Sequence, residues 1–436
     1  MRLAENELQA KFAGKHSVLP PLTISARSGV DAPAFHTFRD LNDLETLRSI
    51  WKSWPGARES DFDLFFSAIK STAQPYVILL SRNARPESIL IGRRERKKMS
   101  FRLGYLTVCG REVEVIEFVN GALRGNASEE NCADLVREVM RSLAAGEADL
   151  VVWEHLDVKS SMYRQAIRLP AFFERDHSRC LKQRWLMKFP NGLDSFLMSL
   201  GRSQRSKLRR KYKKVPTLFP GKVQVRCYRS IAEIDTVVSD MELIASKTAK
   251  RQLGFGFSDT LRAREQMVIA AENGWLRAYV LYLEGKPVAF WTGIVYHRCL
   301  HADHVAYDPS YGKVSPGIFL FLSILEDLRH EDVESIDFGR GNTQLRECFC
   351  DVQRAESRTH IFALTWRGLQ LNILHTAVHL LNGGGVAVLR HIGCLDWVRK
   401  AWRNKLLRGR QQQHRRGFET TASDANQESQ SLVFED

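Results

Sequence analysis

The sequence predicts a mixed α/β (α+β) fold in which a mixed central sheet flanked by helices is built twice in tandem. Residues 299–338 read as strand, turn, helix and strand, and a helix at 132–145 that feeds a strand at 148–154 repeats the second half of that order. The chain has 436 residues with 44% hydrophobic content, which is enough for two cores of ordinary size.

Composition divides the chain into five predicted segments. We expect a flexible polar lead-in at 1–33, a first unit at 34–190, a second unit at 191–365, a helical extension at 366–408 and a disordered tail at 409–436. The final segment is acidic and rich in Ser and Gln, which disfavours a packed core.

In the first unit, residues 42–51 have helical spacing, and short apolar runs predict strands at 76–80, 87–92 and 114–118. In the second unit, a basic helix is followed by predicted strands, of which two lie at 223–227 and 277–283. The extension has helical spacing that we expect to break at its three consecutive glycines, 383–385.

Charge and cysteine usage limit the partners and the compartment. The net charge of +14 favours anionic partners such as CoA, nucleic acid or the inner face of a membrane. Eight dispersed cysteines indicate reduced thiols, and Cys348 and Cys350 lack the second pair that a zinc site would need, so no metal is predicted. Charged residues replace the apolar core of a signal peptide, and no apolar run is long enough to span a bilayer. We therefore expect a cytoplasmic protein.

Residues 307–317 are the most informative stretch, because they join a strand pattern to an amphipathic helix pattern. Ser315 is predicted to cap the helix, Pro316 to occupy its first position and Gly317 to let a ligand approach the free N–H groups. Together with the helix dipole, these groups favour phosphate.

Three neighbouring residues complete this predicted phosphate site. Lys313 adds a full positive charge beside the helix start, and Tyr307 and Val314 lie in the same turn. Because the roles here belong to the backbone, a bulky residue at Gly317 is the most damaging change we predict.

The runs at 275–290, Tyr307-Asp-Pro, Ser315-Pro-Gly and Asp337-Phe-x-x-Gly341 resemble the GNAT-type domain of the CelD/BcsL family. That family is described as acyltransferases linked to cellulose and exopolysaccharide biosynthesis. The resemblance covers about residues 190–352 and implies acetyl-CoA or a longer acyl-CoA as co-substrate, with a small-molecule or saccharide acceptor. Two tandem GNAT-like folds are also the arrangement of FemAB-type transferases, and the first unit, which lacks the Ser-Pro-Gly turn, is predicted to be a scaffold and substrate-side wall.

The chain departs from the family pattern after Gly341. The family usually continues with an acidic residue and a Tyr-Lys pair, whereas this chain continues from Asn342 to Arg346. Asn342 and Arg346 remain candidates for acceptor binding, but Arg346 cannot accept a proton because it stays charged at any working pH.

His301 and Asp303 are the first candidates for catalysis. Period two along a strand places both on one face, where they could share a proton and activate an acceptor. A structural hydrogen-bonded pair is the alternative reading. Metal binding by His297, His301 and His304 is not expected, because their spacing along a strand does not place the three side chains on one face.

Asp337, Arg340 and Tyr311 are the remaining candidates. Asp337 lies where the sheet should open to admit the acyl chain, and it is either a base or orienting group or a turn aspartate beside glycines. Arg340 is a candidate to hold an anionic group of the acceptor. Tyr311 is either the donor of a proton to the departing CoA thiolate or an exposed loop tyrosine.

The predicted mechanism is direct transfer in a ternary complex, since no Cys or Ser lies in a recognisable nucleophile motif. The acyl carbonyl would be polarised by a backbone N–H of the strand at 303–307. No covalent enzyme intermediate is expected.

Two other functions compete with this prediction. A FemAB-like transferase would take an aminoacyl group from tRNA along the basic helix and a loop at 93–98, although the eight cations of 202–214 enclose only Tyr212 as an aromatic platform, which argues against nucleic acid. A non-catalytic assembly factor would dock 366–416 on an anionic membrane surface. The basic helix is alternatively a solvated face, and the sequence leaves the oligomeric state open.

Overall fold

In the computed structural model, the structure describes residues 32–69, 73–103, 106–178, 180–252, 256–340, 349–350 and 352–391. The first unit contains β1 (Ala34–Phe38), α2 (Leu41–Leu44), α3 (Arg48–Ser53), α4 (Phe62–Ile69), β2 (Gln74–Arg82), β3 (Arg85–Leu103), β4 (Leu106–Gly125), α5 (Glu129–Ala144), β5 (Leu150–Asp157) and α6 (Ser161–Arg168). The central strand β6 (Cys180–Lys188) follows, then α7 (Leu193–Ser199) and the basic helix α8 (Arg202–Leu218).

The second unit continues with β7 (Val223–Tyr228), α9 (Ile234–Ser246), α10 (Ala249–Gln252), α11 (Leu261–Glu272), β8 (Leu276–Leu283), β9 (Lys286–Tyr296), β10 (Cys299–Tyr307), α12 (Pro316–Asp327) and β11 (Ser335–Arg340). The second central strand is β12 (Val352–Phe362), and α14 (Trp366–His391) follows it. Short 3-10 turns are η1 (Glu45–Leu47), η2 (Arg58–Ser60), η3 (Ile231–Glu233), η4 (Pro309–Val314) and η5 (Leu328–His330).

These strands form one twelve-stranded sheet in the order β1-β2-β3-β4-β5-β12-β6-β11-β10-β9-β8-β7. Most neighbours are antiparallel, but β4 runs parallel to β5 and β10 runs parallel to β11. Helix α5 connects the first parallel pair and α12 the second, so the predicted repeat of a helix feeding a strand is confirmed. The prediction of a mixed α/β fold with a mixed central sheet flanked by helices is therefore confirmed.

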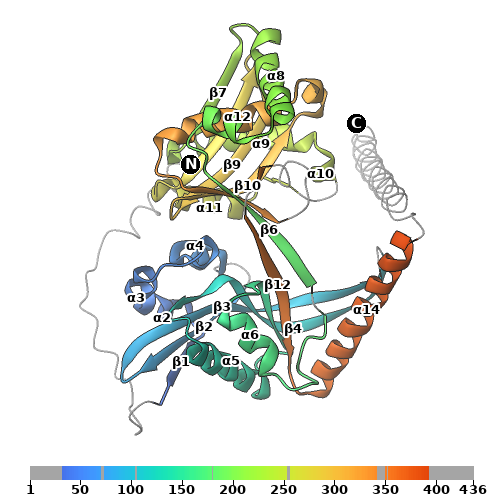
Figure 1. Ribbon diagram of the computed structural model, residues 1–436. Coiled ribbons are helices and arrows are strands. Elements are labelled where there is room, and N and C mark those ends of the chain that lie inside the picture. Colours follow the sequence, from blue (N-terminus) through green and yellow to red (C-terminus); the bar gives the residue numbers. More distant parts are fainter. Residues whose placement is uncertain are drawn as a thin grey trace, which may run out of the picture.

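The two units exchange their central strands. In chain order β6 is the last strand of the first unit, yet it pairs with β11 of the second unit. Conversely, β12 is the last strand of the second unit and pairs with β5 of the first. Strands β6 and β12 then pair with each other from Val352–Leu186 to Arg358–Cys180. Figure 1 shows these two strands running between the upper and lower parts of the molecule.

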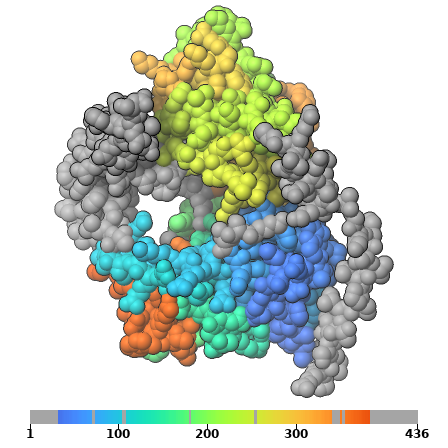
Figure 2. All heavy atoms as spheres, turned by 180° about the vertical axis from the view of Figure 1, so that it is seen from behind, coloured from blue at the N-terminus to red at the C-terminus, as the bar shows by residue number. Residues whose placement is uncertain are grey.

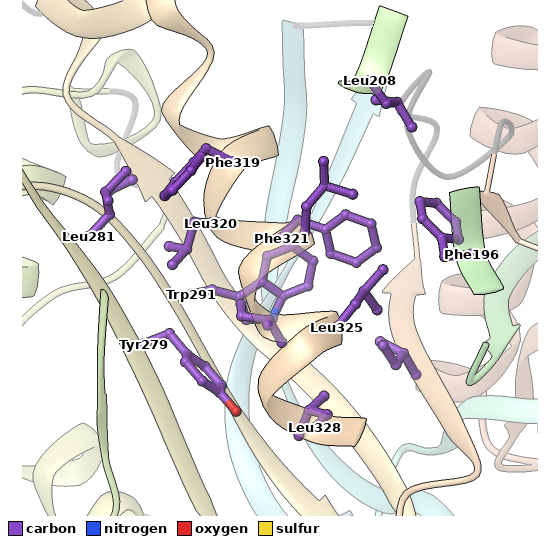
Figure 3. Packing of buried hydrophobic residues seen from close by; sticks show 14 of the residues in the cluster. Phe196, Leu208, Tyr279, Leu281, Trp291, Phe319, Leu320, Phe321, Leu325 and Leu328 are labelled. Atoms are coloured by element: carbon purple, nitrogen blue, oxygen red, sulfur yellow. The ribbon is translucent and has the colours of Figure 1, made fainter. Parts of the chain in front are cut away.

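Helix α12 lies over the second half of the sheet because its apolar residues face Tyr279 of β8 and Trp291 of β9. Figure 3 shows Phe319, Leu320, Phe321 and Leu325 of α12, with Leu328 of η5, between that sheet face and Phe196 of α7 and Leu208 of α8. The rings of Trp291 and Phe321 stack at 5.4 Å. This packing fixes the start of α12 relative to β10.

On the opposite face, the units meet through helices α4 and α11, where the Ser67 hydroxyl donates to Glu265 at 3.4 Å. Figure 2, seen from behind, shows the blue residues of the first unit against the yellow-green residues of the second. Side chains of both units are thus in contact at α4 and α11.

Two local expectations are wrong. Residues 93–98 lie within β3 and do not form a loop, and Arg93, Arg96 and Lys97 pair with glutamates of β4 across the strand register. Helix α14 continues through residues 383–385, because a glycine costs about 1 kcal/mol in a helix and does not by itself end one. The basic track predicted at 93–98 is therefore largely neutralised.

The five cysteines whose side chains are described, which are Cys109, Cys132, Cys227, Cys299 and Cys350, are free thiols. Among the helices of the described ranges, none has the combination of length and apolarity that crossing a bilayer requires.

Arg124 of β4 is a buried link between the units, with only 2% of its surface exposed. Its guanidinium donates to the carbonyls of Trp54 and Ala57 at 2.9 and 3.2 Å and to the Tyr296 hydroxyl of β9 at 3.2 Å. Tyr296 in turn donates to Asp61 at 3.1 Å. One side chain therefore satisfies acceptors from both halves of the chain.

We expect Arg124→Met to lower the free energy of unfolding by about 3 kcal/mol, because each buried acceptor left without a donor costs about 1–3 kcal/mol. Urea unfolding followed by circular dichroism measures the loss. The control is Arg137→Met on α5. The Arg137 side chain is 52% exposed and pairs only with Asp134, one turn earlier in the helix. A loss at Arg124 no larger than in that control would contradict the role of Arg124.

Candidate functional site

The parallel strands β10 and β11 pair over three positions, from Cys299–Ser335 to His301–Asp337. Beyond that point β10 keeps its pairing with β9 through Tyr307, and β11 keeps its pairing with β6 through Arg340. The point after the His301–Asp337 pair, where the strands part, is called the fork below. Backbone groups on the two facing edges beyond the fork are available to a ligand.

The turn that follows β10 is a 3-10 helix, η4, capped by Asp308. The Asp308 carboxylate accepts from the backbone N–H of Ser310 at 3.0 Å and from its hydroxyl at 2.7 Å, and it pairs with Lys247 at 2.7 Å. Pro316 occupies the first position of α12, as predicted. The turn is therefore held in place from both ends.

Ser315 occupies the predicted N-cap position, but its hydroxyl makes no cap hydrogen bond. Its backbone is left-handed (φ 57°, ψ 53°), whereas a capping side chain needs an extended backbone to reach the first-turn N–H groups. Its carbonyl instead accepts from the N–H groups of Ile318 and Phe319. Of the first-turn donors, the Gly317 N–H has no carbonyl of the helix within its reach.

Helix α8 brings positive charge to this turn. Leu208 and Val215 are buried in the core, Tyr212 stacks on Phe319 at 5.0 Å, and the Lys214 ammonium donates to the Lys313 carbonyl at 2.8 Å. Within the residues that the structure describes, no carboxylate forms an ion pair with α8. Its eight cations and Lys313 thus make the surface around the turn strongly positive.

At the fork, a buried charge cluster joins three adjacent strands. Arg184 of β6 donates to the Asp337 carboxylate from Nε at 2.7 Å and from a terminal nitrogen at 2.5 Å, and it lies 3.3 Å from Glu356 of β12. His301 Nδ1 is 3.3 Å from the same Asp337 oxygen. The side chains of Asp337 and Glu356 are only 3% and 7% exposed.

This cluster sets the charge of His301. Burial lowers the pKa of the imidazole, but the Asp337 carboxylate and the Cys299 thiol outweigh it and raise the pKa to about 9. Burial acts on Asp337 in the opposite sense, and His301 and Arg184 hold the pKa of that carboxyl well below its usual range. At neutral pH His301 therefore carries a proton that it can donate, and Asp337 is an anion.

A cavity of about 520 Å³ opens onto His301 and Asp337. Its walls come from both units, with Arg58, Asn120 and His155 contributed by the first. Residues of the first unit therefore form part of the wall of this cavity.

The structure separates the four predicted catalytic residues. His301 and Asp337 face each other at the fork. Asp303 is instead ion-paired with Arg58 at 2.5 Å, because a β-bulge between Ala302 and His304 interrupts the alternation on which the His301–Asp303 pair was predicted.

Tyr311 packs beside Phe219 with ring centroids 6.5 Å apart, and it does not line the described cavity. The six residues predicted to bind the cofactor lie between the last residue of β10 and the first turn of α12. They are Tyr307, Lys313, Val314, Ser315, Pro316 and Gly317. Val314 and Pro316 are buried, so only their backbones can serve a ligand.

The predicted acceptor residues are largely outside the description. Asn342 and Arg346 lie outside the described residues, and for Arg340 only the backbone, at the end of β11, is described.

Arg184, Glu356 and Arg58 are site residues that the sequence did not predict. They lie 153, 172 and 245 residues from their partners, so no local pattern indicates the pairing. Lys214 had a usable signal, because the apolar residues Leu208, Tyr212 and Val215 recur at helical spacing inside the basic run.

Comparison with known proteins agrees with this geometry. Residues 202–347 match the family model described as an acetyltransferase (GNAT) domain, and this stretch contains β10, the turn, α12 and β11. The crystal structure of FemX is similar in fold, with a TM-score of 0.52 and 10% sequence identity over 73% of this chain and 95% of that chain. Within the second unit, residues 202–347 are thus similar to a GNAT acetyltransferase domain.

A tandem GNAT protein from the clavulanic acid biosynthesis pathway is also similar, with a TM-score of 0.45 and 11% identity over 77% of this chain and 99% of that one. No curated protein matches the chain in sequence.

We expect the stability of the protein to report the raised pKa of His301. Because that pKa is raised from 6.5 in the unfolded chain to about 9, its stabilisation is complete below pH 6.5 and is lost as the pH rises through 9. The loss amounts to about 3 kcal/mol for a shift of this size.

Urea unfolding at intervals from pH 6 to pH 10 measures this loss in the wild type and in His301→Gln, which keeps a similar volume without titrating. His330→Gln, at an exposed histidine, is the matched control and should follow the wild type. Parallel pH profiles for the wild type and His301→Gln would contradict the raised pKa.

Proposed function

We propose that this protein is an acyltransferase that moves an acyl group, the acetyl group first among the candidates, from acyl-CoA directly to an amine or hydroxyl. The observation that carries the proposal is the fork with its positively charged turn, inside the segment that matches a GNAT acetyltransferase domain. The phosphate-receptive turn can anchor the pyrophosphate of the donor, and the gap between the two parallel strands can admit its acyl thioester.

The donor would bind with its pyrophosphate at the start of α12. The Gly317 N–H and the dipole of this twelve-residue helix favour an anion there, and Lys313 and Lys214 supply full charges. The acyl thioester would then lie in the gap beyond the fork, where N–H groups on the β10 edge can polarise its carbonyl.

The acceptor would reach the thioester through the cavity at the junction of the units. The acceptor nitrogen or oxygen bonds to the carbonyl carbon as the carbon–sulfur bond breaks, and the acceptor's proton passes to water. His301 can return a proton to the departing thiolate, because its pKa of about 9 is close to the roughly 8.5 of an ordinary thiol. Asp337 holds the imidazole in place and does not itself transfer a proton.

We further propose a saccharide or another small amine or alcohol of exopolysaccharide, cellulose or cell-envelope synthesis as the acceptor. This rests on the resemblance of the 275–290 run and the Ser315-Pro-Gly motif to the CelD/BcsL family. Since acyl-CoA is an intracellular donor, we propose the cytoplasm, including the inner membrane face, as the place of action.

We expect the wild-type protein to bind acetyl-CoA or a longer acyl-CoA with micromolar affinity and Gly317→Trp to bind it at least about tenfold more weakly, a loss of about 1.4 kcal/mol. An added Cβ at Gly317 would lie 3.7 Å from the Tyr307 ring, so Gly317→Ala fits and is the control, whereas an indole would cover the turn. Isothermal titration calorimetry measures all three proteins, and the chain length that binds best identifies the donor.

Absence of binding to every acyl-CoA would refute this donor. Aminoacyl-tRNA is the second candidate, favoured by the eight cations of α8 that no described carboxylate neutralises. Titration with charged tRNA at rising salt tests it, since phosphate contacts give a steep loss of affinity. Binding to anionic vesicles without either donor would instead support the assembly-factor function.

A further inference from the structure

A second polar cluster lies away from the fork, where the segment before β6 meets β12 and α14. Asp176, His360 and His375 each offer one ligand atom there, and these atoms all lie within 4.8 Å of one another. His379, one turn further along the same face of α14, lines the same cavity of about 570 Å³ as His360 and His375. Three separate parts of the chain thus bring metal-ligating side chains together.

Asp176 orients the imidazole of His360. One oxygen of its carboxylate accepts from the backbone N–H of His360 at 3.1 Å and lies 2.7 Å from its Nδ1, and the other accepts twice from Ser178. A cation bound between this carboxylate and Nδ1 would take the place of the proton that they share, so that both groups can act as ligands.

The Nδ1 atom of His375 is buried, has no hydrogen-bond partner among the described residues and lies 3.7 Å from Asp176. The ring centroid of His375 is 4.5 Å from that of His360. A buried polar nitrogen without a partner is costly, and a bound cation would remove that cost.

Nearby positive charges are compensated by carboxylates. Lys97 pairs with Glu95 at 3.1 Å and also with Glu117, and Arg358 pairs with Glu154 at 2.7 Å. Lys98 and Arg102 line the cavity but are exposed. The charge that faces the histidines most closely is therefore the Asp176 carboxylate, whose side chain is 3% exposed.

We propose that Asp176, His360 and His375, with His379 as a fourth ligand, bind a divalent transition-metal ion of the zinc type. Neutral imidazoles and one carboxylate are ligands that Zn²⁺ accepts, and the mixture is too poor in oxygen for Ca²⁺ or Mg²⁺. Ligand atoms around tetrahedral Zn²⁺ lie about 3.3 Å apart, so the ligand atoms of this cluster must move closer together when the ion binds. No hydrogen bond to a described residue holds His375 Nδ1 in its present position.

The ion would fasten α14 to β12 and to the segment before β6. Figure 1 shows α14 alongside the ends of β3 and β4, remote from α12 and its turn. The site is therefore structural and independent of the proposed donor site. None of its residues was considered when the sequence was predicted to bind no metal. That prediction rested on Cys348, Cys350 and the histidines of β10 and its preceding turn.

The test is cobalt binding to the full-length protein after removal of metal with a chelator. Co²⁺ at a site of nitrogen and oxygen ligands gives visible d–d absorption, and we expect saturation at about one ion per chain. Addition of Zn²⁺ should displace Co²⁺ and abolish the band, and it should raise the melting temperature by several degrees, since a ligand that binds only the folded chain stabilises it.

His375→Ala should weaken cobalt binding at least about tenfold, as loss of a ligand or its support does. His330→Ala, at an exposed histidine, should not.

Three results would overturn the proposal. They are the absence of a d–d band in the wild type, an equal band in His375→Ala, and an intense near-ultraviolet thiolate-to-cobalt band that would locate the ion at cysteines. To separate loss of a ligand from loss of the fold, His379→Gln is measured beside His375→Ala, with circular dichroism of both metal-free variants as the check. An unaffected melting temperature in zinc would also count against the site.

Discussion

The ion pair between Arg184 and Asp337 holds the centre of the molecule together. Arg184 lies on β6, its principal partner on β11 and its second carboxylate, Glu356, on β12, so one guanidinium joins three adjacent strands. Removal of Arg184 would deprive two buried carboxylates of the guanidinium that they share, and removing one partner is the costly way to break a buried ion pair. The same pair keeps Asp337 ionised and thereby charges His301, so the electrostatics of the site follow from an interaction that the sheet itself needs.

The site lies where it does because regular pairing ends there. Beyond three register positions, the described part of the chain pairs β10 only with β9 and β11 only with β6, so the N–H and carbonyl groups on their facing edges have no partner strand there. A turn made positive by α8 borders one end of this gap, and the cavity built by both units borders the fork. Donor and acceptor are thereby given separate approaches to one point.

Local patterns in the sequence were enough to predict the strand, turn, helix and strand around Pro316, and the repeat in which α5 and α12 each feed a strand. Features that depend on contacts distant in sequence were not predicted. The bulge that separates His301 from Asp303, the pairing of Arg184 and the gathering of Asp176 with His360 and His375 all depend on strands that meet only in the folded sheet. Ser315 shows a subtler limit, because its residue type is that of a cap while its left-handed backbone prevents the hydroxyl from capping.

The exchange of β6 and β12 has a consequence for the order in which the protein can be made. During synthesis the first unit emerges with β5 lacking its partner, since that partner is β12, which ends at Phe362. The nascent chain therefore carries an incomplete sheet edge through the production of nearly two hundred further residues, and both halves become complete at almost the same moment. A protein with the outline of two domains thus completes its sheet as a single unit.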